Sequence, residues 1–142
     1  MTGPLAHVRI ADFTWLGAGS YATKILADFG ADVIKIESSE RVDSLRLAAP
    51  YKDGRKGVNR SGYFADRNSS KRSVTINMKH PAALSIVRRL VLQSDVVANN
   101  FAPGVMERFG LGYEAVCEMK PDIIYLAMSM LGSDGPESSY IG

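Results

Sequence analysis

The stretch LGAGSYATKILADFGADVIKIE, residues 16–37, decides the fold class of this chain. Residues 8–13, VRIADF, precede it as a strand candidate, and residues 20–29 carry apolar side chains at helical spacing. The apolar face of this predicted helix consists of Ala22, Ile25, Leu26 and Phe29. Gly30 ends the helix, and residues 33–36 form a short apolar strand. A strand, a helix and a second strand at this spacing predict a right-handed βαβ unit with parallel strands.

The alternation of strands and helices continues along the chain. Residues 38–68 show no periodicity and are predicted to form a long surface loop. Pro81 is predicted to open a helix with an apolar stripe of Leu84, Val87, Leu90 and Val91. Further strands are predicted at 73–78, 95–99 and 121–130, and two short helices at 105–109 and 113–120. The sequence therefore predicts an α/β fold, a Rossmann-like parallel sheet with flanking helices, whose strands are covered on both faces.

Composition and charge narrow the class of protein. Of the 142 residues, 46% are hydrophobic and 23% are charged, as in one ordinary globular domain. The formal net charge of +2 gives no reason to expect a nucleic acid as partner. Cys117, the only cysteine, is predicted to be a small buried side chain. The N-terminus does not resemble a leader and no apolar run is long enough for a membrane helix, so we expect a cytoplasmic protein without membrane association.

The glycine pair has the spacing of a dinucleotide-binding turn. Residues 17–22, GAGSYA, match the pattern G-x-G-x-x-G/A between a strand and a helix, and Glu37 follows Gly17 by twenty positions. In such a turn the glycines let backbone N–H groups approach a pyrophosphate, and the helix N-terminus adds a partial positive charge. These residues alone leave two alternatives open: a site for a nicotinamide or flavin cofactor, or a turn that only connects a strand to a helix.

A set of longer segments narrows these alternatives. They are PLAHVRIADFT (4–14), GSYATKILADFGADVIKIE (19–37), NSSKRSVTINMKHP (68–81), DVVANNFAPGVMERFGLGYEAV (95–116) and PDIIYLAMSMLGSDGP (121–136). In order and spacing the set resembles the N-terminal part of the family III CoA-transferases, the CaiB/BaiF type, which includes formyl-CoA transferase and α-methylacyl-CoA racemase. The resemblance implies that residues 1–142 are the CoA-binding N-terminal part of such a domain, and that the glycine turn serves coenzyme A, with no metal.

The resemblance assigns the coenzyme contacts to several segments. Gly17 and Ala18 are implied to pass the pantetheine arm, because small side chains there let the thiol end thread inward. The segment of Ile76, Asn77, Met78 and Lys79 is implied to lie along the nucleotide, and the Lys79 ammonium would meet a phosphate. The residues alone also permit a different interpretation, in which Lys79 is a solvated surface cation.

The segment NNFAPGVMER completes the implied contacts. Asn100, Phe101 and Ala102 are implied to line an adenine pocket, where an aromatic ring beside an amide suits a purine, and Arg108 is implied to reach the phosphates. Without the resemblance, Phe101 would be core, Asn100 would cap a strand and Arg108 would be a solvated cation.

Four positions depart from the family pattern. The family usually has an arginine for a CoA phosphate directly after the sequence IE, and this chain has Ser38 there. Arg41 or Arg46 is a candidate to replace that arginine. Asn99 and Ala102 replace a glutamate and an arginine of the usual ENFRPG. Ser20 stands where the family has a proline, and we expect it to act as the N-cap of the first helix.

The chemistry implied by the resemblance lies outside this chain. The transferases use an aspartate as nucleophile on the acyl-CoA thioester, and the racemases move an α-proton between an acid and a base. In both branches these groups follow the segment that matches residues 140–142, and no acid, histidine or serine of this chain is assigned a catalytic role. We therefore expect a fragment or one subunit, completed by further polypeptide or a second chain and dimeric in its complete form. Its ligands would be an acyl-CoA and a carboxylic acid acceptor. A CoA- or NAD-binding module without catalysis is the alternative.

Overall fold

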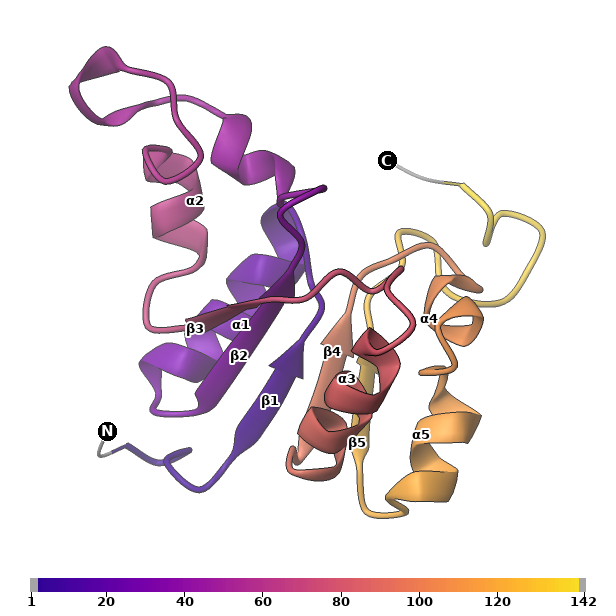
Figure 1. Cartoon of the computed structure of the whole chain (residues 1–142). Coiled ribbons are helices and arrows are strands. Elements are labelled where there is room, and N and C mark those ends of the chain that lie inside the picture. Colours follow the sequence, from indigo (N-terminus) through magenta and orange to yellow (C-terminus); the bar gives the residue numbers. More distant parts are fainter. Residues whose placement is uncertain (1–2, 141–142) are drawn as a thin grey trace.

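The computed structural model describes residues 3–140, which form a five-stranded, all-parallel sheet (Figure 1). The strands follow the order β3-β2-β1-β4-β5 across the sheet. Their bounds are β1 (Arg9–Asp12), β2 (Asp32–Glu37), β3 (Arg72–Thr75), β4 (Val96–Asn99) and β5 (Ile124–Ala127). The helices are α1 (Gly17–Asp28), α2 (Gly62–Arg67), α3 (Ala83–Leu92), α4 (Val105–Arg108) and α5 (Tyr113–Met119), with short 3-10 turns η1 (Ser44–Leu47) and η2 (Lys52–Gly54). The predicted α/β fold with a Rossmann-like parallel sheet is confirmed.

Two apolar clusters cover the two faces of the sheet. On one face Ala27 and Ala31, at and just after the end of α1, pack with Ile10 and Val33 of the central strands. On the other face the cluster joins the sheet to α3, α4 and α5, and its members include Ala11, Phe13, Ile36, Val87, Val91, Val97, Met106 and Val116. Helices α1 and α2 accordingly lie on one side of the sheet and the three later helices on the other (Figure 1). Leu84 and Leu90 flank the second cluster, as their predicted stripe requires.

Helix α1 differs from its prediction in both start and orientation. It begins at Gly17 rather than at residue 20, so the glycine pair lies in its first turn. Its buried side is made of small residues, namely Gly19, Ser20, Thr23 and Ala27. The predicted apolar face is wrong for Ile25 and Phe29, which are 39% and 56% exposed, whereas Leu26 packs against the cluster on this face. Small and hydroxyl-bearing side chains let the helix approach the sheet closely, which the hydrophobic pattern does not report.

The two edge strands are only partly covered. Every residue of β4 is buried, whereas on β5 Ile124 is 63% exposed and Tyr125 and Leu126 are half-buried. The polar strand β3 is also largely exposed. The prediction that the strands are covered on both faces is therefore correct for β4 and wrong for the edges of the sheet. Cys117, predicted to be buried, is half-buried on α5.

The long segment between β2 and β3 has more structure than the sequence predicts. Besides η1 and η2 it contains α2, and α2 packs against both α1 and η1. Ser61 caps α2, since its hydroxyl accepts a hydrogen bond from the Phe64 N–H at 3.1 Å. Asp43 and Leu45 are buried there. The structured part anchors this segment beside the start of α1, while residues around η2 project outward (Figure 1).

Within residues 3–140, no helix combines the length and apolar character that crossing a membrane demands. The same residues contain no group of three or more histidine, cysteine, aspartate or glutamate side chains placed to hold a metal ion.

Candidate functional site

The strand order places a topological switch point between β1 and β4. Because all strands are parallel, the connections that leave β1, β2, β3 and β4 emerge at one edge of the sheet. In open α/β sheets the crevice outside these carboxyl ends is where ligands bind. Each implied coenzyme contact up to Ala102 lies in one of these four connections or in the first turn that follows it.

The connections after β1 and β4 are joined by one side chain. The Asn100 amide oxygen accepts a hydrogen bond from the Trp15 N–H at 2.8 Å, and its amide nitrogen donates to the Trp15 carbonyl at 2.7 Å. The Trp15 and Phe101 rings meet edge to face with centroids 6.0 Å apart. Asn100 therefore joins these two connections through both ends of its side-chain amide.

At Gly19, helix α1 packs closely against Thr14 and the Asn100 side chain. A Cβ atom at position 19 would lie 2.8 Å from the Thr14 Cβ and 2.9 Å from the Asn100 Cγ, whereas one at Gly17 would meet only the Tyr63 hydroxyl at 3.9 Å. Neither Thr14, which is fully buried, nor Asn100, which is held by Trp15, can move aside without cost. The second glycine of the motif therefore serves packing between the helix and the sheet.

We expect Gly19→Ala to lower the free energy of unfolding by about 1–3 kcal/mol, because the added methyl group overpacks a filled site. Gly17→Ala is the matched control, since its methyl group has space and alanine favours the helix. Chemical denaturation of the two variants measures the difference. Equal stabilities would contradict the packing role of Gly19.

The N-terminus of α1 opens toward the same edge. Its N-cap is Leu16, with φ 61° and ψ −157°, and no side chain among residues 3–140 caps the helix. Ser20, the expected N-cap, is instead buried on the inner side of the first turn. The orphan N–H groups of a first turn and its partial positive charge favour an anion. Gly17 is half-buried and Ala18 is exposed, so a ligand can approach both.

The other implied contacts lie in the connections that follow β3 and β4 and on α4. Residues 76–79 follow β3, and Ile76 and Met78 pack against the same apolar cluster as Phe101. The side chain of Asn77 donates to Glu40 at 2.8 Å, and Lys79 is exposed. Arg108 folds back from α4 toward the β4 connection, so that a Cβ at Gly104 would lie 3.3 Å from its Nη1.

The structure separates the two arginines that could stand in for the arginine absent at Ser38. The Arg46 guanidinium binds both Glu37 carboxylate oxygens, at 2.8 and 2.7 Å, and lies 3.6 Å from the Phe64 ring centroid. Arg41 is exposed and lies over the Trp15 ring at 5.4 Å. Arg46 is therefore engaged within the fold, whereas Arg41 forms no ion pair with residues 3–140.

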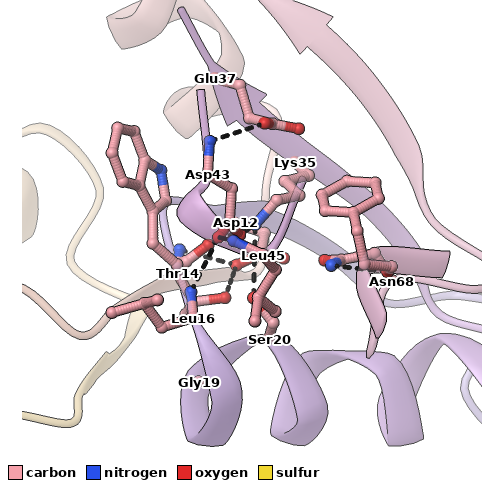
Figure 2. A network of polar contacts seen from close by, with 12 residues as sticks. Asp12, Thr14, Leu16, Gly19, Ser20, Lys35, Glu37, Asp43, Leu45 and Asn68 are labelled. Atoms are coloured by element: carbon pink, nitrogen blue, oxygen red, sulfur yellow. Dashed lines mark hydrogen bonds and ion pairs between the residues drawn. The ribbon is translucent and has the colours of Figure 1, made fainter. Parts of the chain in front are cut away.

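A network of buried charged side chains lies next to the first turn of α1 (Figure 2). Lys35 and Asp43 form an ion pair at 3.0 Å with side chains 1% and 0% exposed. Lys71 and Asp12 form a second pair at 3.0 Å, with 2% and 0% exposed. Burial lowers the pKa of Lys71 from its ordinary value, and the Asp12 carboxylate opposes this. No local sequence pattern predicts either ion pair, because the two partners of each pair lie in separate strands or connections.

A small hollow lies at the ends of β4 and β5, beside Phe101 and Ala102, with Tyr125 in its wall. The Tyr125 hydroxyl donates to the Leu111 carbonyl at 3.0 Å. Burial, followed by the nearby Glu107 carboxylate, raises the pKa of Tyr125 to about 12.

Because the folded state holds the Tyr125 proton more tightly than the unfolded state, stability is lost as the pH rises from 10 to about 12. We therefore expect the wild type to lose stability relative to Tyr125→Phe across this interval and not below it. Urea denaturation of both proteins at pH 8.5 and pH 11 measures the change. A constant difference between them would contradict the raised pKa.

Together, the parallel sheet, its switch point and the helix N-terminus define a Rossmann-like α/β domain with an open site at the carboxyl ends of its strands. The model of the family described as CoA-transferase family III matches residues 5–142, and the chain belongs to this family. Similar curated proteins are CoA-transferases by name. The succinate–glutarate CoA-transferase of Agrobacterium fabrum is 36% identical over 98% of this chain, and the human succinyl-CoA:glutarate CoA-transferase is 37% identical over 98%.

Solved structures agree with this membership. A CaiB/BaiF family protein from Brucella suis aligns with a TM-score of 0.89 at 33% identity, covering 100% of this chain and 37% of that protein. A protein from Mycobacterium tuberculosis aligns with a TM-score of 0.87 at 34% identity, covering 99% and 38%. The chain spans 35% of the Agrobacterium relative and 31% of the human one, about a third of their length.

Proposed function

We propose that residues 1–142 are the CoA-binding N-terminal part of a CoA-transferase. The observation that carries this proposal is the convergence of four connections on one edge of the sheet, beside the uncapped start of α1. Coenzyme A offers a pyrophosphate to that helix start and an adenine to the aromatic side chains that follow β1 and β4. Lys79, Arg108 and Arg41 supply cations for its phosphates, with Arg41 in place of the arginine absent at Ser38.

The proposed reaction moves CoA from an acyl-CoA to a carboxylic acid. An aspartate carboxylate attacks the thioester carbonyl carbon, the C–S bond breaks and the CoA thiolate leaves, so that an anhydride forms. The thiolate then attacks the aspartyl carbonyl of the anhydride, releases the donor acid and gives an aspartyl thioester, which the acceptor carboxylate takes over by the same two steps in reverse. The relatives named above are transferases of this donor and acceptor class by name.

The nucleophilic aspartate of this proposal lies outside the chain. The carboxylates around the site are engaged within the fold, since Asp12 binds Lys71, Glu37 binds Arg46 and Asp43 binds Lys35. The chain by itself is then a binding unit, and transfer needs the remaining polypeptide that its longer relatives possess or a partner chain. We propose that the complete protein is a homodimer, and the alternative activity is that of a racemase of the same family.

Glu37 argues against an NAD site. A dinucleotide-binding domain uses an acid at this position to accept a hydrogen bond from the ribose 2′-hydroxyl. Both Glu37 oxygens are held by Arg46, one also accepts the Asp43 N–H at 3.2 Å, and the side chain is 5% exposed. A ribose would have to displace this arginine from a buried pair.

Isothermal titration calorimetry of the chain with CoA and with NAD tests the proposal. We expect binding of CoA and none of NAD. Lys79→Met should weaken CoA binding roughly tenfold, because a charge-assisted contact to a phosphate is lost. Lys56→Met is the matched control, since Lys56 is equally exposed but lies in the segment that projects away from the strand ends. A chain that binds NAD and ignores CoA would overturn the proposal.

A further inference from the structure

We propose that the buried pair of Lys35 and Asp43 is a positioning device, which holds Leu16 in a left-handed backbone conformation and thereby aims the first-turn N–H groups of α1 at the ligand. The proposal rests on the CoA site proposed above for its effect on binding, but its effect on Leu16 is independent of any ligand.

Leu16 is the strained residue of the site. Its φ of 61° and ψ of −157° fall in a region that is essentially restricted to glycine, so the conformation is strained for a leucine. The Leu16 side chain is 51% exposed, so its own packing contributes little to holding this conformation. The backbone contacts of Leu16 must therefore supply the restraint.

Asp43 supplies that restraint. Its Oδ1 accepts hydrogen bonds from the Leu16 N–H at 3.1 Å and from the Leu45 N–H at 3.0 Å. The Asp43 backbone is fixed in turn, because its N–H donates to Glu37 at 3.2 Å. The carboxylate is fully buried, and the Asp43 side chain extends toward Leu16 (Figure 2).

Lys35 fixes the same turn from the other side. Its Nζ lies 3.0 Å from Asp43 Oδ2, donates to the Thr14 carbonyl at 2.5 Å, and lies 3.4 Å from the Ser20 hydroxyl. One ammonium therefore links the residues before Leu16, the first turn of α1 after it, and the carboxylate that binds its N–H. Buried pairs of this kind contribute little net stability compared with apolar replacements, whereas their directional contacts fix a geometry.

A matched pair of double variants isolates the acceptor oxygen. Lys35→Met/Asp43→Asn keeps an Oδ1 acceptor for the Leu16 N–H, and Lys35→Met/Asp43→Ala removes it; neither leaves an unpaired ammonium. By amide hydrogen exchange without ligand, we expect the Leu16 amide to exchange roughly tenfold faster in the alanine variant than in the asparagine variant. We expect the CoA dissociation constant to be roughly tenfold higher as well, a change equivalent to 1.4 kcal/mol.

Adding Leu16→Gly to the alanine variant supplies the rescue. Glycine adopts a positive φ without penalty, so most of the CoA affinity should return, and folding should return if the alanine variant is unfolded. Equal exchange at Leu16 in the two double variants, or no recovery on adding Leu16→Gly, would overturn the positioning role. If the wild type binds no CoA, the proposed function fails, while the exchange measurement still decides whether Asp43 holds Leu16.

Discussion

Asp12→Ala is expected to lower the free energy of unfolding by about 3–5 kcal/mol, because it leaves the buried Lys71 ammonium without its partner. Asp12 also accepts hydrogen bonds from the Thr14 hydroxyl at 2.6 Å and the Thr23 hydroxyl at 2.9 Å. Lys71 joins β1 to the buried side of α1, since it donates to the Ser20 carbonyl at 2.8 Å and to Thr23 at 2.7 Å. The pair therefore stabilises the βαβ unit itself. Urea denaturation gives the free energy difference.

Two further variants control this experiment. Asp122→Ala breaks the exposed ion pair with Lys120 and should leave the denaturation midpoint unchanged. Asp12→Asn/Lys71→Met removes both buried charges and should be less destabilised than Asp12→Ala. If Asp12→Ala and Asp122→Ala were equally stable, the buried pair would have no structural role.

Glu37→Ala is expected to cost about 3 kcal/mol, because it leaves the Arg46 guanidinium, which is only 12% exposed, without its carboxylate. The same change removes the acceptor of the Asp43 N–H and so loosens the segment that supports Leu16. The thermal and urea midpoints of Glu37→Ala should both fall. Glu40→Ala is the control, since Glu40 is exposed. Within residues 3–140, the Glu40 carboxylate accepts one hydrogen bond, from the Asn77 side chain.

Glu37→Ala/Arg46→Met distinguishes a structural glutamate from a ligand-binding one. If the glutamate serves the fold, removing the arginine as well restores part of the lost stability. A Glu37→Ala variant of wild-type stability would show that the carboxylate is available to bind a ligand. That result would support a dinucleotide-binding site.

The sequence predicts the sheet well because buried parallel strands are short apolar runs between turn residues. Residues 33–36 and 95–99 fall on strands β2 and β4 for this reason. The buried side of α1 could not be read in this way. Hydrophobic spacing favours Ile25 and Phe29, whereas the close approach to the sheet selects Gly19, Ser20 and Thr23, whose hydroxyls join the network of Asp12 and Lys71.

The location of the candidate site could be predicted from the sequence. The hydrogen bonds that hold its backbone in place could not. The glycine spacing and the family resemblance indicate where a nucleotide would lie. The role of Asn100 in binding Trp15, and that of Asp43 in binding Leu16, depend on contacts between residues 85 and 27 positions apart. Such contacts leave no periodic pattern in the sequence. Residues 38–68 are therefore predicted to be a surface loop, although they contain Asp43 and Arg46.

Binding of coenzyme A at the carboxyl ends of the strands is the basis of the proposed function. The most direct measurement is a CoA titration of the ¹⁵N-labelled chain followed by two-dimensional NMR. We expect saturable shifts of the Gly17 and Ala18 amides, of residues 76–79 and of residues 100–102, with none at residues 51–60. Shifts confined to the other end of the sheet, or no shifts at saturating CoA, would contradict it.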